Sequence, residues 1–417
     1  MRSVLGQLRV LRHPAFRNLW LAQTTSVVGD RLVIVALALY VTDLTGSATD
    51  VGLVLGAQTV PLVAFLLIGG VWADRMARAK LMIATDVVRA ALHLLLAALI
   101  FTDVVAVWQI VVIEALFGTA QAFFQPAYSG LLPRTVPEEE IQEAQALTNL
   151  TANFAELTGP ALATALVLGA GAGWAFLLDA LTFVVSVVLM LRVRVSDEPV
   201  VGERRTALAE LAEGFAEVRS RPWIWVTVVV FAIAVPVGYA PLFVLGPAIA
   251  EDSYGSATLF GIVTTLFGAG ALLGALSGLR WRPLHPMRAG FFIIAGWPLL
   301  LVAFGLVAPA ALVFVLAFVT GAGFALFDVW WNTAMAERVP PHALSRVSAY
   351  DWMGSLILLP VGFLLAGPIA EATTDATVMV AGGVLTALFL VLGLIPRETR
   401  TLRRVERPAV SPLRTPR

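Results

Sequence analysis

The chain has 417 residues, of which 59% are hydrophobic and only 13% are charged, and its mean hydropathy is +0.86. An average soluble domain has about 25% charged residues, so this chain carries roughly half of the charge that a soluble surface needs. There is no cysteine, which excludes disulfides, thiolate metal sites and cysteine nucleophiles. The 28 basic and 28 acidic residues balance, so the net charge does not point to nucleic acid. The composition predicts an integral membrane protein.

Long apolar runs along the chain predict the membrane spans. A transmembrane helix needs about 20 predominantly apolar residues. The bilayer core offers no water to satisfy an open backbone, so the spans are expected to be helices and the fold all-α. The sequence yields twelve spans, approximately at residues 17–41, 51–73, 81–101, 104–131, 141–168, 173–192, 223–249, 256–279, 288–307, 310–335, 343–369 and 376–395.

The positions of the basic residues predict the orientation of these spans. With the N-terminus placed in the cytoplasm, the inner segments contain 26 of the 28 lysines and arginines, and the outer loops contain none. The remaining two, Arg31 and Arg89, lie within spans. Because positive residues concentrate on the cytoplasmic side, we expect both termini to be cytoplasmic.

The chain repeats itself at half its length. The segment GSATDVG at 46–52 recurs as GSATLFG at 255–261, and GTAQAFFQP from Gly118 aligns with GAGFALFDV from Gly321. Both copies run through the membrane in the same direction, so the repeat predicts two parallel six-helix halves. The predicted domains are an N-terminal half at 1–192, a cytoplasmic linker at 193–222, a C-terminal half at 223–396 and a basic cytoplasmic tail at 397–417. The second part of the linker is expected to form a surface helix.

This organisation resembles the major facilitator superfamily. The loop after the second span resembles the superfamily's loop motif at its glycine, aspartate and basic positions, which are here Gly70, Asp74, Arg75, Arg78 and Lys80. Ala77 stands where that motif usually has glycine. The resemblance implies that Asp74 latches the two halves together on the cytoplasmic side. An ordinary, positively charged inner loop is the alternative interpretation.

The third and fifth spans carry further motifs. Asp86, Arg89 and His93 lie on one face of the third span, and with the preceding loop they resemble the branch of siderophore exporters and macrolide-efflux proteins. The resemblance implies that the Asp86–Arg89 pair braces the fold rather than contacts cargo. In the fifth span, Gly159 and Pro160 match two positions of the antiporter motif, whose other three positions differ here. Small residues at those positions still permit close helix contact.

Ionisable residues inside the spans are the candidates for function, since each costs at least ~2.5–3.5 kcal/mol at mid-helix. The candidates are Asp30, Arg31, Glu114, Glu156, Asp179, Asp328 and Asp351. The resemblance implies that spans 1, 4, 7 and 10 line a central cavity. Asp30, near the middle of span 1, is the first choice for a proton-carrying carboxylate, and a structural ion pair is the alternative.

The remaining candidates have their own surroundings in the sequence. Glu114 and Asp328 also lie on expected cavity spans, and Asp328 is followed closely by Trp331 and Asn332. Glu156 comes one turn after two asparagines on the same face of span 5, which predicts a polar relay.

The last candidates differ in the role that the sequence indicates. Asp179 is expected to bond to a neighbouring helix, and Asp351 belongs either to the cavity or to the latch. Tyr239 stands in the second half at the position equivalent to Asp30, inside the segment VPVGYAPLFVLGP, whose prolines should bend span 7. Aromatic side chains such as Tyr239 and Trp331 suit a large amphipathic cargo.

These observations predict a secondary active transporter, and we expect a proton-coupled exporter of drugs or natural products that works by alternating access. An importer or facilitator of a small nutrient is the first alternative, and a membrane receptor or scaffold without transport is the second. The sequence contains no GxxxxGK[ST] motif, and we expect neither an enzyme, a cofactor nor a bound nucleotide. The expected partners are a small-molecule cargo, protons and the lipid of a bacterial inner membrane, without nucleic acid, and the chain is expected to be monomeric.

Overall fold

A computed structural model of the chain describes residues 8–195, 214–278 and 280–404. Throughout these residues the regular structure is helical, as the sequence predicts. The first half consists of six long helices, α2 (Pro14–Thr45), α3 (Ala48–Arg75), α4 (Arg78–Phe101), α5 (Val107–Leu131), α6 (Ile141–Gly169) and α7 (Ala172–Met190). A short turn, η1 (Leu8–Arg12), precedes them, and η2 (Leu132–Thr135) and η3 (Glu138–Glu140) connect α5 to α6. Each long helix coincides with one predicted span.

The second half contains more breaks than the first. Its segments are α9 (Pro222–Ala234), η4 (Val235–Tyr239), α10 (Ala240–Tyr254), α11 (Thr258–Gly278), α12 (Pro286–Ile293), α13 (Gly296–Gly305), α14 (Ala310–Arg338), α15 (Pro341–Leu356), α16 (Leu359–Ala372), α17 (Asp375–Gly393) and α18 (Arg397–Thr401). The predicted bend in span 7 is present as the π-helical turn η4, which contains Pro236. Pro298 and Pro360 follow the breaks in two further spans. Proline has no N–H to donate and its ring clashes with the preceding turn, so the α-helical ladder is interrupted before it.

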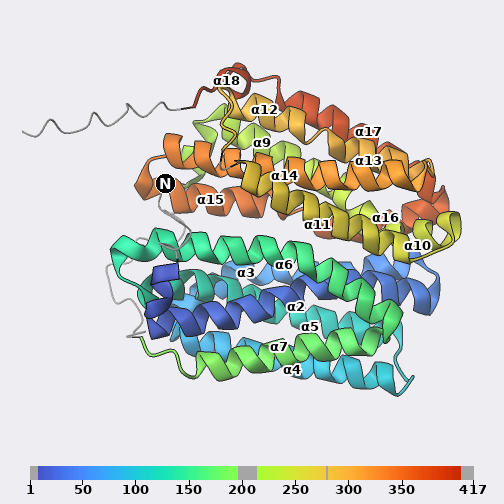
Figure 1. Cartoon of the computed structure of the whole chain (residues 1–417), viewed down its shortest axis with the longest axis horizontal. Coiled ribbons are helices and arrows are strands. Elements are labelled where there is room, and N and C mark those ends of the chain that lie inside the picture. The colour runs from blue at the N-terminus through green and yellow to red at the C-terminus, as the bar shows by residue number, and fades with distance from the viewer. Residues whose placement is uncertain (1–7, 196–213, 279, 405–417) are drawn as a thin grey trace, which may run out of the picture.

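Ten helical stretches of the described residues are long and apolar enough to cross a membrane. Two further helices, α2 and α6, are not among these ten, although they are 32 and 29 residues long. Both are longer than the about 20 residues that a crossing needs, and both run alongside the other helices of their half (Figure 1). These two helices carry Asp30, Arg31 and Glu156. The twelve-span topology stays a prediction, and it requires α2 and α6 to cross as well.

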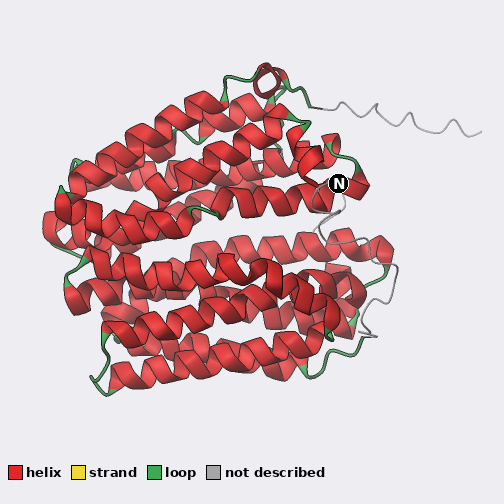
Figure 2. Ribbon diagram, turned by 180° about the vertical axis from the view of Figure 1, so that it is seen from behind, coloured by secondary structure: helices red, strands yellow, loops and turns green. Residues whose placement is uncertain are grey.

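The helices form two bundles that lie side by side. Figure 1 shows α2–α7 below and α9–α17 above, and Figure 2 shows the same division from behind. The bundles contact each other through α3 with α16, α6 with α11, and α10 with both α2 and α3. The first and last described helices, η1 and α18, lie at the same end of the bundles (Figure 1), which we call the terminal end. The opposite end is called the distal end.

The sequence repeat corresponds to equivalent contacts within the two bundles. Gly118 on α5 lies directly against α3, because a Cβ there would be 1.9 Å from the carbonyl oxygen of Gln58. Its repeat equivalent, Gly321 on α14, lies against α11 in the same way, with 1.8 Å to the carbonyl oxygen of Phe267. Such an approach of two backbones leaves no room for a side chain and requires glycine.

A second pair of repeated glycines lies between the bundles. A Cβ on Gly52 of α3 would be 2.2 Å from the carbonyl oxygen of Phe363 on α16. A Cβ on Gly261 of α11 would be 2.1 Å from Oγ1 of Thr164 on α6. The same sequence element therefore makes the α3–α16 and the α6–α11 contacts, so the two halves are structurally related.

The apolar core is shared between the bundles toward the distal end. The largest cluster of buried residues joins Leu39 and Val54 of the first bundle to Val244 and Phe363 of the second. Toward the terminal end each bundle has a separate cluster, one around Phe16, Leu81 and Leu131 and the other around Met287, Met335 and Val347. Near the distal end the two bundles therefore share one apolar core, and near the terminal end each bundle has a core of its own.

The predicted domain boundaries stay predictions. Residues 214–219, in the second part of the predicted linker, are helical as expected, whereas residues 196–213 of the linker and residues 405–417 of the basic tail lie outside the described residues.

Candidate functional site

Two neighbouring residues of α2, Asp30 and Arg31, make ion pairs in different directions. Adjacent positions on a helix point about 100° apart, so the two side chains do not face each other. Arg31 Nε lies 2.8 Å from Oε2 of Glu156 on α6. Asp30 Oδ1 lies 3.8 Å from Nη1 of Arg89 on α4. The middle of α2 therefore connects the surface between the bundles to the inside of the first bundle.

The Arg31–Glu156 pair is held where α2 and α6 approach closely. A Cβ on Gly159 would be 2.5 Å from Cβ of Arg31, so the glycine of the predicted span 5 motif allows this contact. Pro160 follows directly in the same helix. The two paired side chains are 43% and 33% exposed, although they lie near the middle of long helices. The pair is therefore accessible to solvent in the middle of the fold.

The second bundle contributes Tyr239 to this region. Its hydroxyl lies within electrostatic range of both Arg31 and Glu156. The Tyr239 ring packs on Phe243, with 4.6 Å between the ring centroids. The region thus combines a cation and an anion of the first bundle with an aromatic pair of the second.

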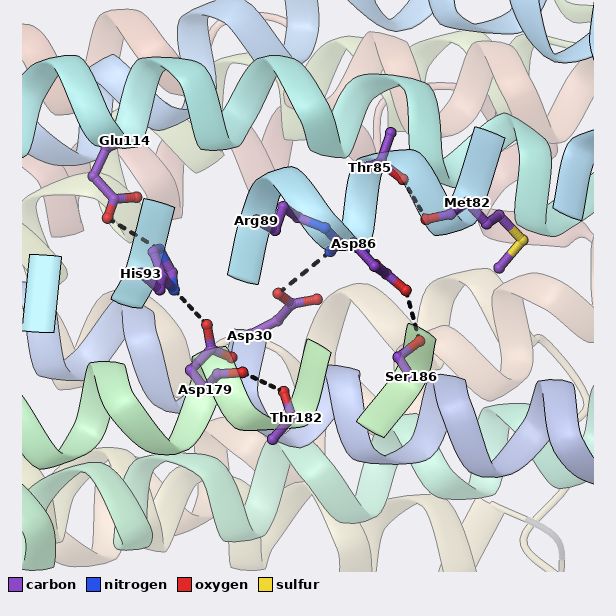
Figure 3. A network of polar contacts seen from close by, with 10 residues as sticks. All are labelled: Asp30, Met82, Thr85, Asp86, Arg89, His93, Glu114, Asp179, Thr182 and Ser186. Atoms are coloured by element: carbon purple, nitrogen blue, oxygen red, sulfur yellow. Dashed lines mark hydrogen bonds and ion pairs between the residues drawn. The ribbon is translucent and has the colours of Figure 1, made fainter. Parts of the chain in front are cut away.

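Behind Asp30, the inside of the first bundle contains a buried polar network (Figure 3). Arg89 is only 1% exposed and pairs with Asp86 one turn earlier on α4. Ser186 Oγ on α7 donates to Asp86 Oδ2 at 2.6 Å. The guanidinium lies over the rings of Phe124 and Phe183, 4.2 and 4.3 Å from their centroids. Arg89 is therefore fixed by charge and by aromatic faces together.

His93 occupies the other end of this network, one turn after Arg89. Its Nδ1 faces Oδ2 of Asp179 on α7 at hydrogen-bonding distance, and its Nε2 lies 3.4 Å from Oε1 of Glu114 on α5. The imidazole stacks on Phe117, with ring centroids 4.2 Å apart and planes 2° apart. His93, Glu114 and Asp179 are all fully buried. Figure 3 shows the imidazole between the two carboxyl groups. We call these three residues the histidine triad.

A glycine brings the histidine triad next to Asp30. A Cβ on Gly29 would be 1.9 Å from Oδ1 of Asp179, so this carboxyl oxygen lies on the backbone of α2. Among the described residues, neither this oxygen nor Asp30 Oδ1 has a hydrogen-bond partner. In Figure 3 the Asp30 carboxyl points to Arg89 and lies beside Asp179. The side-chain exposure falls from 21% at Asp30 to zero at Asp179, so the path leads from solvent into the bundle.

The candidates of the second half lie apart from this network. Asp328 on α14 is exposed, and its Oδ1 accepts from Nδ2 of Asn332 at 2.8 Å. Trp331 is buried, and its Nε1 donates to Oδ2 of Asp351 on α15 at 2.8 Å. Asp351 therefore binds α15 to α14 inside the second bundle.

The basic loop motif is described in part. Arg75 and Lys80 are exposed, and Arg78 Nη1 donates to the carbonyl oxygen of Gly130 at 3.0 Å, which connects α4 to the end of α5. The surroundings of Gly70 and the side chain of Asp74 lie outside what the structure describes, so the predicted latch stays a prediction.

The sequence indicated some of these groups without indicating how they are connected. It placed Asp86, Arg89 and His93 on one face of a helix and expected Asp179 to bond to a neighbour. It assigned Glu114 to the cavity, whereas the structure buries this side chain inside the first bundle, facing His93. The position of His93, one turn beyond Arg89 on an otherwise apolar face, was the available signal. The two asparagines of the predicted relay, Asn149 and Asn153, have side chains outside the described residues.

Two related helical bundles with charged side chains between and within them define a multi-pass membrane transporter. The chain belongs to the Major Facilitator Superfamily, whose family model matches residues 19–356. Members of this family are transporters and not enzymes, so a small-molecule cargo and a membrane location follow.

Proteins similar to this chain include two bacterial exporters. Macrolide efflux protein A of Streptococcus pyogenes is 24% identical over 368 residues, which cover 85% of this chain and 89% of that protein. The enterobactin exporter EntS of Citrobacter koseri is 26% identical over 412 residues, or 95% of this chain and 96% of that one. Among solved structures, the nucleoside transporter NupG superimposes with a TM-score of 0.69 at 12% identity, covering 91% of this chain and 98% of that chain. This last likeness shows the fold alone.

Proposed function

We propose that the chain exports amphipathic drugs or natural products in exchange for protons, by alternating access. One observation carries the proposal: Asp30 and Arg31 connect two different sites from adjacent positions of α2. The Arg31–Glu156 pair is open to solvent and can meet a cargo, whereas Asp30 borders the buried network and can carry a proton. An exchanger needs a cargo site and a proton site that influence each other, and one helix that joins both provides this.

Export is supported by the similarity to a macrolide efflux protein and to an enterobactin exporter over most of the chain. The proposed cargo is amphipathic because the groups around Arg31 are mixed. A charged pair can bind polar groups of a cargo, and the rings of Tyr239 and Phe243 offer an apolar face.

The direction of opening fits the same proposal. The bundles share a core near the distal end and have separate cores near the terminal end. With both termini in the cytoplasm of a bacterial cell, as we propose, this state opens toward the cytoplasm and collects cargo there. We further propose that the chain works as a monomer in the inner membrane.

The test measures efflux of radiolabelled erythromycin, a macrolide, from proteoliposomes that contain the full chain, with and without a pH gradient. We expect the gradient to accelerate efflux in the wild type, and Asp30→Asn to remove the acceleration. The matched control is Asp43→Asn, because Asp43 is an exposed aspartate on the same helix outside the network. Efflux that is equally fast without a gradient in the wild type would contradict proton coupling.

A second candidate function is import or facilitated diffusion of a small nutrient. The chain shares its fold with a nucleoside transporter, and one fold can serve both uptake and export. Radiolabelled uridine, offered to the same proteoliposomes, distinguishes the two functions. Uptake of uridine that erythromycin does not inhibit would favour the nutrient transporter. A chain that moves neither compound, nor any other in a wider screen, would favour the third possibility, a receptor or scaffold.

A further inference from the structure

The histidine triad cannot satisfy its hydrogen bonds without a bound proton. A neutral imidazole has one N–H donor and one bare acceptor nitrogen, and an ionised carboxylate only accepts. Nδ1 of His93 is hydrogen-bonded to Asp179, and Nε2 faces Oε1 of Glu114 at 3.4 Å. Neither Nε2 nor the Glu114 carboxyl oxygens have a hydrogen bond to any other described residue. With both acids ionised and the ring neutral, one nitrogen lone pair would face a carboxylate. One added proton, on the ring or on a carboxyl, removes this conflict, so the triad is built to hold a proton.

The charges of the whole network lead to the same conclusion. Four carboxyl groups, those of Asp30, Asp86, Glu114 and Asp179, surround one guanidinium and one imidazole. The guanidinium of Arg89 balances one carboxylate. Arg31, next to Asp30, is paired with Glu156 outside the network. Among the described residues of the network, the other three carboxyl groups are therefore balanced only by protons, on the imidazole or on the carboxyls themselves. Unbalanced charge is costly in a membrane-spanning bundle, and more than one proton is needed to reduce it.

We propose that Glu114, His93 and Asp179 form a second, buried proton-binding site of the transporter, which exchanges its proton with solvent through Asp30. This inference rests on the proposed proton-coupled function and deepens it: the first bundle holds two proton sites in series rather than a single carboxylate. Asp30 is the outer site, partly exposed, and the histidine triad is the inner site, without contact to solvent.

The route between the two sites is short and already polar. Asp179 Oδ1 lies on the backbone of Gly29, next to Asp30, and its other oxygen contacts His93. Both Asp179 Oδ1 and Asp30 Oδ1 are buried without a hydrogen-bond donor among the described residues. A proton that leaves Asp30 can therefore pass to Asp179, and from there to the imidazole. Because Arg89 also reaches Asp30, loss of the Asp30 proton strengthens that ion pair and links proton movement to the position of α2.

Each helix that packs around His93 contributes identified charged groups. They are Asp30 from α2, Asp86 and Arg89 from α4 itself, Glu114 from α5 and Asp179 from α7. The nonpolar surroundings of the ring are Phe117, Phe176 and Phe183. Among the charged side chains of this network, Asp30 is the one with substantial exposure, at 21%, so the proposed route for the proton begins there.

The first arm of the test observes His93 itself. The chain has four histidines, and the triple variant His13→Asn/His285→Asn/His342→Asn keeps His93 alone without altering the triad. The ring is labelled with nitrogen-15, and solid-state NMR of the full chain in lipid follows the two ring nitrogens as the pH changes. We expect their signals to change with pH and to differ in Glu114→Gln and Asp179→Asn. If the two ring nitrogens keep the same protonation state over the pH range in which transport changes, the proposal is overturned.

The second arm measures erythromycin efflux from proteoliposomes. We expect Asp179→Asn, Glu114→Gln and His93→Gln to lose the acceleration by a pH gradient while they retain exchange of internal for external erythromycin at equilibrium. Asp179→Glu restores a carboxyl group and is expected to recover part of the acceleration. Asp43→Asn is the matched control and should behave as the wild type.

The outcomes separate this inference from the function on which it rests. Triad variants that remain folded and keep the full acceleration would show that the triad only holds α4, α5 and α7 together. A wild type without any gradient dependence would overturn the proton-coupled function, and the triad's part in coupling with it. The NMR measurement on the triple histidine variant leaves the triad itself unchanged. It therefore tests the proposal even if a triad variant fails to fold.

Discussion

At the scale of single residues, Gly29 determines whether the network can form. A methyl group at this position would lie 1.9 Å from Asp179 Oδ1 and 2.8 Å from Thr182 Oγ1, so α2 or α7 would have to shift. We expect Gly29→Ala to destabilise the fold by ~1–3 kcal/mol, the usual cost of overpacking, and to abolish gradient-driven efflux. Thermal unfolding in detergent and erythromycin efflux measure the two effects. Gly169→Ala is the control, because nothing lies within 4 Å of its added methyl group, and it should change neither.

The Arg31–Glu156 pair should affect cargo more than stability. Exposed ion pairs contribute only about 0–1 kcal/mol, and both side chains here are partly exposed. We therefore expect Arg31→Ala to leave the unfolding temperature nearly unchanged and to weaken erythromycin binding by about tenfold, which corresponds to about 1.4 kcal/mol. Equilibrium binding of the radiolabelled macrolide measures this change. A large loss of stability with unchanged binding would instead make the pair a structural brace.

Single residues also show how far the sequence could predict the site. The cost of charge in a membrane was enough to select Asp30, Arg31 and Glu156, because such residues need a reason to be there. It could not show which acid meets which base. Asp179 and His93 are 86 positions apart, and their contact depends on how α4 and α7 are packed. The contact of Glu114 with His93 was not predicted for the same reason, since span number alone does not indicate which face of α5 points inward.

At the scale of helices, the repeated glycines make a prediction about two equivalent contacts. Gly118 and Gly321 each bring two backbones together within one bundle. We expect Gly118→Ala and Gly321→Ala to destabilise the chain to a similar degree, by ~1–3 kcal/mol each, because each added methyl group would meet a rigid carbonyl oxygen. Gly278→Ala on α11 is the comparison: the atoms nearest to its methyl group belong to the side chain of Val329, at 3.0 Å or more, so it should cost less. Unfolding of the three variants under identical conditions tests the ranking.

Helices were also the level at which the sequence was most informative. Apolar runs and prolines predicted the helices of both halves and the bend in span 7, which appears as η4. The breaks before Pro298 and Pro360 follow the same chemistry and were not predicted. The repeat predicted two related halves, and the contacts of Gly52 and Gly261 explain why those segments are alike: each supplies one of the two main contacts between the bundles.

At the scale of the whole molecule, alternating access requires the contacts at the distal end to separate during each cycle. Ser47 at the start of α3 lies close to Glu371 near the end of α16, with 3.4 Å between Oγ and Oε1, so this pair bridges the two bundles. The chain contains no cysteine, and cysteines can be introduced at these two positions without a background. In the double variant Ser47→Cys/Glu371→Cys, we expect a short bis-maleimide reagent to cross-link the two cysteines. Erythromycin efflux should then stop, because the distal end can no longer open. Each single cysteine, treated with the same reagent, should keep its efflux. Full transport by the cross-linked chain would exclude opening at this end, and with it the alternating-access mechanism proposed for this protein.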